Sequence, residues 1–206
     1  MNDGNAGERE RWAKRYTAPG YLFGTEPNAF LKSHAGLLRK GQTALAIADG
    51  EGRNGVFLAE QGLDVLSLDF SDVAQEKARA LAKNRGVPLG LQQADMTAWN
   101  WTPETFDVVV GIFIQFAKPA DRAVMFAGIK KTLKPGGLLL IQGYGLKQLE
   151  YKTGGPSEPE RLYTRTMLEE AFGDFSSLEI AEHDSAIKEG DHHVGMSALV
   201  DLVGRK

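Results

Sequence analysis

Three closely spaced glycines could hold part of a nucleotide cofactor. Residues 44–48 form a short apolar run, and Gly50, Gly52 and Gly55 follow it in a G-x-G-x-x-G pattern. This pattern is typical of a strand that turns sharply into a helix, where free backbone N–H groups and the positive end of the helix dipole face a ligand. The run predicts a nucleotide-cofactor site, and a tight turn that binds nothing is the alternative.

A carboxylate stands where a ribose-binding group is expected. Asp69 lies nineteen positions after Gly50 and ends a second apolar run, residues 64–69. The segment between the two runs has the length of one helix, so the whole forms one β-α-β unit. Asp69 could accept hydrogen bonds from both ribose hydroxyls, which favours an adenosine cofactor. Its alternative role is that of a helix cap, because Ser71 and Asp72 follow.

Alternating strand and helix patterns predict the elements that position these groups. Continuous apolar runs are typical of strands that helices cover on both faces. Two strands at the end of the chain suggest an antiparallel hairpin at the sheet edge. The expected fold is therefore a doubly wound, mostly parallel, seven-stranded Rossmann-like sheet. The predicted strands are 43–48, 64–69, 88–93, 106–112, 137–143, 178–183 and 194–203, and the helices between them are 53–61, 72–85 and 119–133, with a further helix from Thr164 or Thr166 to Phe172.

About forty residues precede the first strand. Residues 8–16 have helical character, and Pro27 is expected to begin a second helix. We interpret residues 1–40 as a helical cover over the cofactor and residues 41–206 as the catalytic core of a single domain.

Composition narrows the class of partner. The 206 residues carry a formal net charge of −3 and contain no cysteine. Nucleic-acid binding usually requires clustered Lys and Arg, so a nucleic-acid substrate is not expected. The sequence shows neither a secretory signal nor a membrane-spanning run, and no metal-ligand set is expected. We predict a cytoplasmic protein, a monomer or a homodimer, that acts on a small molecule.

Four sequence runs together resemble those of the class I S-adenosylmethionine-dependent methyltransferases. Within them, the chain is similar to the tellurite-resistance and thiopurine S-methyltransferase-like group. The group-specific matches are residues 21–28 and the Glu189-Gly190, His193 and Gly195 pattern. The motifs that carry the general resemblance are residues 48–54, 68–71, 94–96 and 133–137.

The resemblance implies a set of cofactor-binding residues. It implies that Gly50 and Gly52 border the methionine part, that Asp69 binds the ribose, and that Asp95 accepts from the adenine amino group. Many relatives carry an acidic residue at the position of Ala46 and a glycine at that of Ala48, and Asp49 could replace the missing carboxylate. The full set of expected cofactor-binding residues is Asp49, Gly50, Gly52, Asn54, Asp69, Phe70, Asp95, Met96, Gly111 and Ile112.

The sulfonium cofactor makes the methyl group electrophilic, so the protein mainly aligns the acceptor. The acceptor is expected to be a soft sulfur, selenium or tellurium nucleophile. His193, or else His34 or His192, could remove a proton. Arg53 could guide an anionic acceptor or the cofactor carboxylate, or it could form a structural salt bridge. Phe113 and Phe116 could face an apolar acceptor or simply pack in the core. Two other functions remain open at this stage, namely a non-catalytic S-adenosylmethionine-binding or regulatory protein and a nicotinamide-dependent oxidoreductase.

Overall fold

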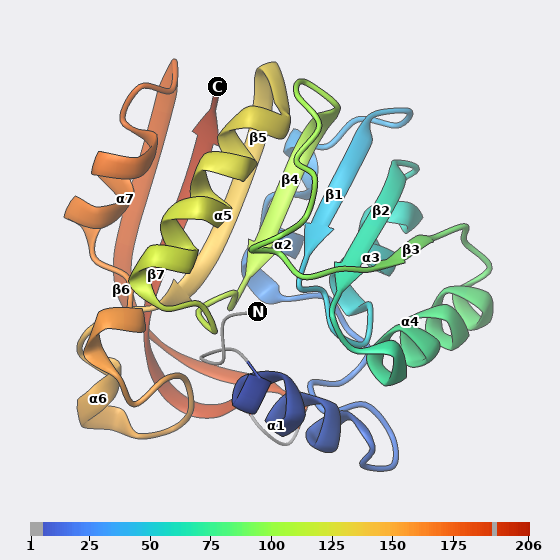
Figure 1. The fold of residues 1–206 in the computed structure, drawn as a ribbon, viewed down its shortest axis with the longest axis horizontal. Helices are drawn as coiled ribbons and strands as arrows, with labels where there is room; N and C mark the ends of the chain where they lie inside the picture. The colour runs from blue at the N-terminus through green and yellow to red at the C-terminus, as the bar shows by residue number, and fades with distance from the viewer. Residues whose placement is uncertain (1–5, 191–192) are drawn as a thin grey trace.

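A seven-stranded sheet with helices on both faces forms the centre of the molecule (Figure 1). The computed structural model describes residues 6–190 and 193–206. The strand order is β3-β2-β1-β4-β5-β7-β6; five strands are parallel, and β7 runs antiparallel to both β5 and β6. The predicted mostly parallel Rossmann-like sheet with a terminal antiparallel hairpin is therefore confirmed. The strands are β1 (Thr43–Ile47), β2 (Asp64–Asp69), β3 (Gly90–Gln93), β4 (Phe106–Ile112), β5 (Leu133–Tyr144), β6 (Ser177–Glu189) and β7 (His193–Arg205).

Alternate residues of the central strands pack into two separate hydrophobic cores, one on each face of the sheet. On β1, Leu45 and Ile47 pack with α5 and α7, whereas Ala44 and Ala46 pack with α2 and α3. Because side chains alternate across a strand and both faces are covered, the central strands are apolar throughout. The helices are α1 (Ala6–Tyr16), α2 (Ala29–Ser33), α3 (Arg53–Glu60), α4 (Asp72–Arg85), α5 (Pro119–Thr132), α6 (Gln148–Tyr151) and α7 (Arg165–Phe172), with 3₁₀ turns at Ala35–Leu37 and Pro159–Arg161.

Several element boundaries differ from the prediction, most clearly in β5, α2 and the two hairpin strands. Strand β5 begins at Leu133 rather than 137, because Leu133 already pairs with Phe106 across an irregularity of β4. Pro27 does not begin α2, since the side chain of Asn28 caps that helix by accepting a hydrogen bond from the Leu31 N–H. Both hairpin strands extend to 13 residues, well beyond the predicted spans.

Helix α1 lies below the end of the sheet at which β1 and β2 finish (Figure 1). It packs on α4, where Tyr16 and Leu22 form a small apolar cluster with Ala74. Lys77 of α4 donates hydrogen bonds to the carbonyl groups of Ala18 and Gly20. These contacts hold the N-terminal segment across the carboxyl edge of the parallel strands, the edge at which α/β proteins bind ligands.

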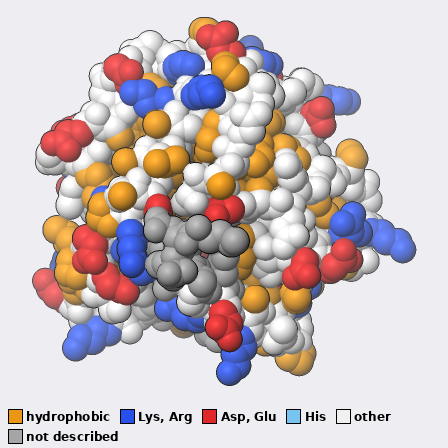
Figure 2. Space-filling view, in the orientation of Figure 1, with side chains coloured by type: hydrophobic (Ala, Val, Ile, Leu, Met, Phe, Trp, Pro, Cys, Tyr) orange, Lys and Arg blue, Asp and Glu red, His pale blue; other side chains and the backbone are white. Residues whose placement is uncertain are grey.

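The surface in Figure 2 carries basic and acidic side chains interspersed around its rim. Among the described residues, no helix is long and apolar enough to cross a membrane.

Candidate functional site

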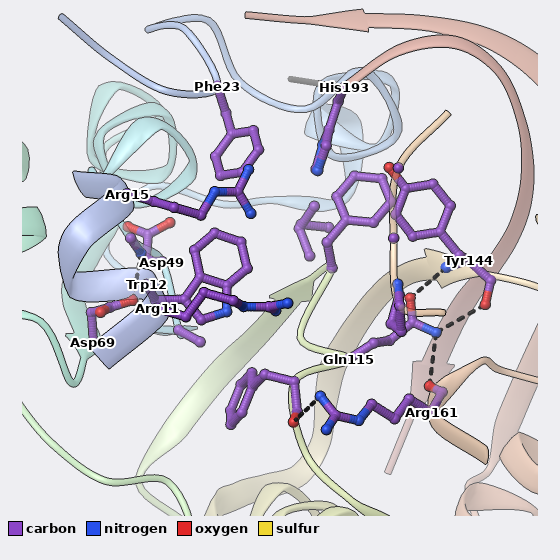
Figure 3. A pocket seen from close by; sticks show the side chains of 18 of the residues that line it. Arg11, Trp12, Arg15, Phe23, Asp49, Asp69, Gln115, Tyr144, Arg161 and His193 are labelled. Atoms are coloured by element: carbon purple, nitrogen blue, oxygen red, sulfur yellow. Dashed lines mark hydrogen bonds between the residues drawn. The ribbon is translucent and has the colours of Figure 1, made fainter. Parts of the chain in front are cut away.

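A cavity of about 280 Å³ opens at the carboxyl ends of β1, β2 and β4 (Figure 3). Its walls come from the glycine turn, from α1 and from the far end of the β6–β7 hairpin. Described residues distant in sequence therefore meet around one space. The residues that line the cavity include Arg11, Trp12, Arg15, Phe23, Asp49, Gly50, Arg53, Asn54, Asp69, Phe70, Ile112, Phe113, Gln115, Phe116, Tyr144, Arg161 and His193.

The backbone of the glycine turn is left-handed at several positions. Gly50 has φ of +58° and Gly52 has φ of +87°, a region that glycine enters without a steric penalty. Ala48 also has a positive φ, +47°. An L-residue in this region costs about 1–2 kcal/mol, so a glycine would be energetically more favourable at that position.

Gly52 begins α3 as its N-cap and is needed for close packing. A Cβ atom at Gly52 would lie 2.5 Å from the Cβ atom of Ala78, on α4. Gly52 is not among the residues that line the cavity. The structure therefore gives this glycine a role in the contact between α3 and α4, and contact with the cofactor stays a prediction.

Asp69 points into the cavity and braces the turn. Its carboxylate accepts the N–H of Gly50 and the N–H of Ser71, each at 2.9 Å. Burial raises the pKa of Asp69 to about 6, although these backbone N–H groups favour the ionised form. Asp69 is therefore an anion at neutral pH, with acceptor capacity left for ligand hydroxyls.

Asp49 is a second buried carboxylate of the cavity wall. It accepts hydrogen bonds from the N–H of Gly55 and from the hydroxyl of Ser67. Burial raises its pKa to about 7, and the nearby Asp69 charge adds to that effect. Asp49 thus caps the first turn of α3 and can change its charge near neutral pH.

The substitution Asp49→Asn is expected to change how stability depends on pH. Between pH 4 and 7 the unfolded wild-type carboxyl has ionised while the folded one still holds its proton, so wild-type stability falls as pH rises. The variant lacks this loss. Its free energy of unfolding relative to wild type should rise by on the order of 2–4 kcal/mol from pH 4 to pH 8. Chemical denaturation of both proteins measures the difference, and a difference independent of pH would contradict the assignment.

Arg53 and His193 meet at a common carboxylate. Arg53 Nη2 lies 2.7 Å from Glu189 Oε2, and His193 Nδ1 lies 3.3 Å from the same oxygen. Burial opposes ionisation of Glu189, but the hydrogen bonds and charges of His193 and Arg53 outweigh it and lower its pKa to about 2. Burial lowers the pKa of His193, and Glu189 only partly offsets this. At neutral pH the cluster holds a neutral imidazole beside a buried ion pair.

Three aromatic rings surround His193. Ring centroids of Phe23 and Phe113 lie 4.3 Å and 4.7 Å from the imidazole, and that of Tyr144 lies 5.9 Å away. Phe113 has φ of +55°, a strained conformation of the kind that clusters at functional sites. We call Phe23, Phe113, Tyr144 and His193 the aromatic box. Both Phe113 and Phe116 line the cavity, as one of the two sequence interpretations expected.

The other predicted site residues divide into two groups. Asn54, Phe70 and Ile112 line the cavity, whereas Asp95, Met96 and Gly111 are not among its lining residues. The structure thus gives the positions of these six residues, and their roles in binding a cofactor stay predictions.

The three residues outside the lining have structural contacts of their own. Asp95 accepts hydrogen bonds from the N–H and hydroxyl of Thr97, and Met96 is buried in the core. A Cβ atom at Gly111 would lie 2.7 Å from a methyl carbon of Ile114.

Of the alternative histidines, His34 does not line the cavity. Its ring lies beside the carbonyl of Phe30, at 2.9 Å. His192 lies outside the described residues.

Several lining residues have no motif that marks them. Arg11 and Arg15 extend from α1 toward the cavity, and Arg15 stacks over Trp12 at 4.4 Å. Gln115 holds the opposite wall by bonding the backbone of Tyr144 and Arg161. The expected helical cover over residues 1–40 agrees with the position of the α1 residues at the cavity, whereas the position of Arg161 depends on the path of a long loop.

Comparison with known families identifies part of the chain. Residues 44–137 match the family model described as methyltransferase domain. Two relatives carry related names. Phosphoethanolamine N-methyltransferase 1 of Triticum aestivum is 31% identical over 112 residues, which make up 52% of this chain and 22% of that protein. Carboxy-S-adenosyl-L-methionine synthase of Pseudomonas fluorescens is 25% identical over 168 residues, 77% of this chain and 63% of that protein.

The chain thus spans less than two thirds of either relative's length. The segment that matches the methyltransferase-domain model includes the glycine turn, Asp69 and the strands that frame the cavity.

Solved structures share the fold over most of the chain. A protein studied for the conversion of a disulfide bond into a thioacetal group during echinomycin biosynthesis has a TM-score of 0.73 and 17% identity, covering 94% of this chain and 88% of that one. TehB from Haemophilus influenzae has a TM-score of 0.71 and 17% identity, covering 96% of this chain and 66% of that one. At such identity the likeness concerns the fold alone.

Proposed function

We propose that the protein is an S-adenosylmethionine-dependent methyltransferase that acts on a small, soft sulfur, selenium or tellurium nucleophile. The observation that carries this proposal is the shape of one cavity. A buried carboxylate beside a glycine turn forms one wall, and the aromatic box with a neutral histidine forms another. The first wall suits an adenosine cofactor, and the second suits a small apolar acceptor.

The cofactor wall fits S-adenosylmethionine. Asp69 keeps free acceptor capacity toward the cavity while its backbone contacts fix its position, as a ribose diol requires. Gly50, Asn54, Phe70 and Ile112 would surround the remainder of the cofactor, and Asp49 would meet its amino end. When bound, the sulfonium supplies an electrophilic methyl group, and alignment of the acceptor supplies most of the rate.

The acceptor wall favours a soft, small nucleophile. The rings of the aromatic box offer apolar contact, and His193 is the one neutral base that the described cavity residues provide. The limited cavity volume also favours a small molecule over a nucleic acid. The cytoplasmic location and the monomeric or dimeric state stay predictions from the sequence.

Helix α1 is proposed to cover the bound cofactor. Trp12 lines the cavity and stacks on Tyr16 with ring centroids 5.7 Å apart. Trp12→Ala should weaken binding of S-adenosylmethionine by about 5- to 30-fold, since an aromatic face attracts a cation by about 1–2 kcal/mol. Binding of S-adenosylhomocysteine, whose sulfur is uncharged, should weaken less. Calorimetric titration gives both affinities; Trp99→Phe, outside the cavity lining, is the control, and an unchanged affinity for both ligands would reject the cover.

The proposed activity is tested by supplying trideuteromethyl S-adenosylmethionine with a panel of thiols, selenite and tellurite. Mass spectrometry should detect a trideuteromethyl product together with S-adenosylhomocysteine. Binding of the cofactor without turnover on the whole panel would instead favour a non-catalytic binding protein.

A further inference from the structure

Glu189 is the centre of a buried polar cluster, and the sequence pattern that contains it indicated no role for its carboxylate. Its side chain is 9% exposed and has partners from three elements. Oε2 faces Arg53 and His193, and Oε1 accepts a hydrogen bond from Asn28 Nδ2 at 2.8 Å. Asn28 is itself buried, and its backbone N–H donates to Asn54 Oδ1. The carboxylate is therefore held at both oxygens by segments that are far apart in sequence.

This arrangement fixes which nitrogen of His193 carries the proton. An ionised carboxylate only accepts hydrogen bonds, so Nδ1 must be the donor to Glu189. In a neutral imidazole the other nitrogen, Nε2, is then an acceptor. Figure 3 shows the His193 ring pointing into the cavity, beside the side chain of Tyr144. The lone pair of Nε2 is thus available on the side where an acceptor would sit.

We propose that Glu189 is a positioning residue that holds His193 in the tautomer whose Nε2 accepts a proton from an incoming thiol. The inference rests on the methyltransferase function proposed above. In the step, the S–H bond breaks, the proton moves to Nε2, and the sulfur electron pair forms a bond to the transferred methyl group. The bond between that methyl group and the cofactor sulfur breaks, leaving a thioether and S-adenosylhomocysteine, and the imidazolium returns its proton to water.

The same geometry favours the structural salt bridge among the roles expected for Arg53. Its guanidinium is buried and directed at Glu189, at 2.7 Å, instead of standing free to guide an anionic acceptor. Arg53 acts on the carboxylate and keeps it ionised. Other charged or titratable groups near His193 are Arg15 on α1 and Tyr144 on β5. The positive charges of Arg15 and Arg53 lower the pKa of His193 and so favour the neutral imidazole, whereas Glu189 favours the protonated one.

The tautomer can be measured without any substrate. Nitrogen-15 NMR of histidine-labelled protein at neutral pH should show His193 protonated at Nδ1. In Glu189→Gln the charged acceptor for Nδ1 is lost, so the spectrum should change toward the Nε2-protonated form that a free neutral imidazole side chain prefers. Glu179→Gln, an exposed position on the same strand, is the matched control and should leave the spectrum unchanged. An Nε2-protonated ring in the wild-type protein, or an unchanged ring in Glu189→Gln, would overturn the proposal.

A kinetic arm separates this inference from the proposed function. Phenylmethanethiol is mostly un-ionised at neutral pH, whereas 4-nitrothiophenol is mostly ionised and needs no base. Glu189→Gln should lower kcat/KM for the first about 100-fold, and that for the second by less than about twofold, because general bases contribute about 10²–10⁴-fold. Equal losses for both thiols would reject the positioning role.

Failure of the proposed methylation and failure of the positioning role of Glu189 give different results in these experiments. If the wild-type protein methylates neither thiol, the proposed thiol methylation fails and the NMR result still decides the tautomer. If Glu189→Gln does not fold because Arg53 is left without a counter-charge, the double variant Arg53→Met/Glu189→Gln removes both charges and is measured in its place.

Discussion

Replacing Asp69 with alanine is expected to weaken binding of S-adenosylmethionine at least about 100-fold. Two hydrogen bonds from ribose hydroxyls to an ionised carboxylate would be lost, at about 1.5–3 kcal/mol each. The substitution also removes the acceptor for two buried N–H groups, those of Gly50 and Ser71, which further loosens the turn. Calorimetric titration measures the loss directly.

The control for Asp69→Ala lies on the same strand. Asp64 is an exposed carboxylate at the start of β2, so Asp64→Ala should keep the wild-type affinity. Thermal unfolding of both variants shows whether the Asp69 variant is still folded. A folded Asp69→Ala protein with unchanged affinity would mean that this carboxylate serves only as a cap for the turn.

Replacing His193 with alanine is expected to reduce turnover of an un-ionised thiol by about 10²–10⁴-fold. The proposed base disappears, while the cofactor wall around Asp69 stays intact. Affinity for S-adenosylmethionine should therefore change by less than about threefold, a small fraction of the loss in rate. Initial rates at saturating cofactor, together with titration, measure the two effects, and unchanged turnover would exclude His193 as the base.

Much of the core could be predicted because a local run of apolar residues indicates a buried strand. Strands β2 and β4 match their predicted spans, and β1 differs by one residue, because each is a mainly apolar run of the length of one strand. The carboxyl-edge position of the site followed from the same pattern, since parallel strands all finish at one edge. The first motif also placed Asp49, Gly50 and Asn54 correctly on the cavity wall.

The rest depends on contacts that no local pattern records. Arg53 and Glu189 are 136 positions apart, and they meet because the hairpin strands extend beyond the predicted spans and reach the cavity. At Gly52 the absence of a side chain allows close helix packing against Ala78, a role that the G-x-G-x-x-G pattern does not indicate. Local spacing alone does not distinguish a glycine needed for packing from one needed for a ligand.

The most direct test of the account is calorimetric titration of the wild-type protein with S-adenosylmethionine, S-adenosylhomocysteine and the oxidised nicotinamide dinucleotide. If the cavity is a methyl-donor site, the protein should bind both sulfur compounds with micromolar affinity, and the dinucleotide should give no heat of binding. If neither sulfur compound binds, or if the dinucleotide binds in their place, the cavity is not a methyl-donor site and the proposed function is wrong.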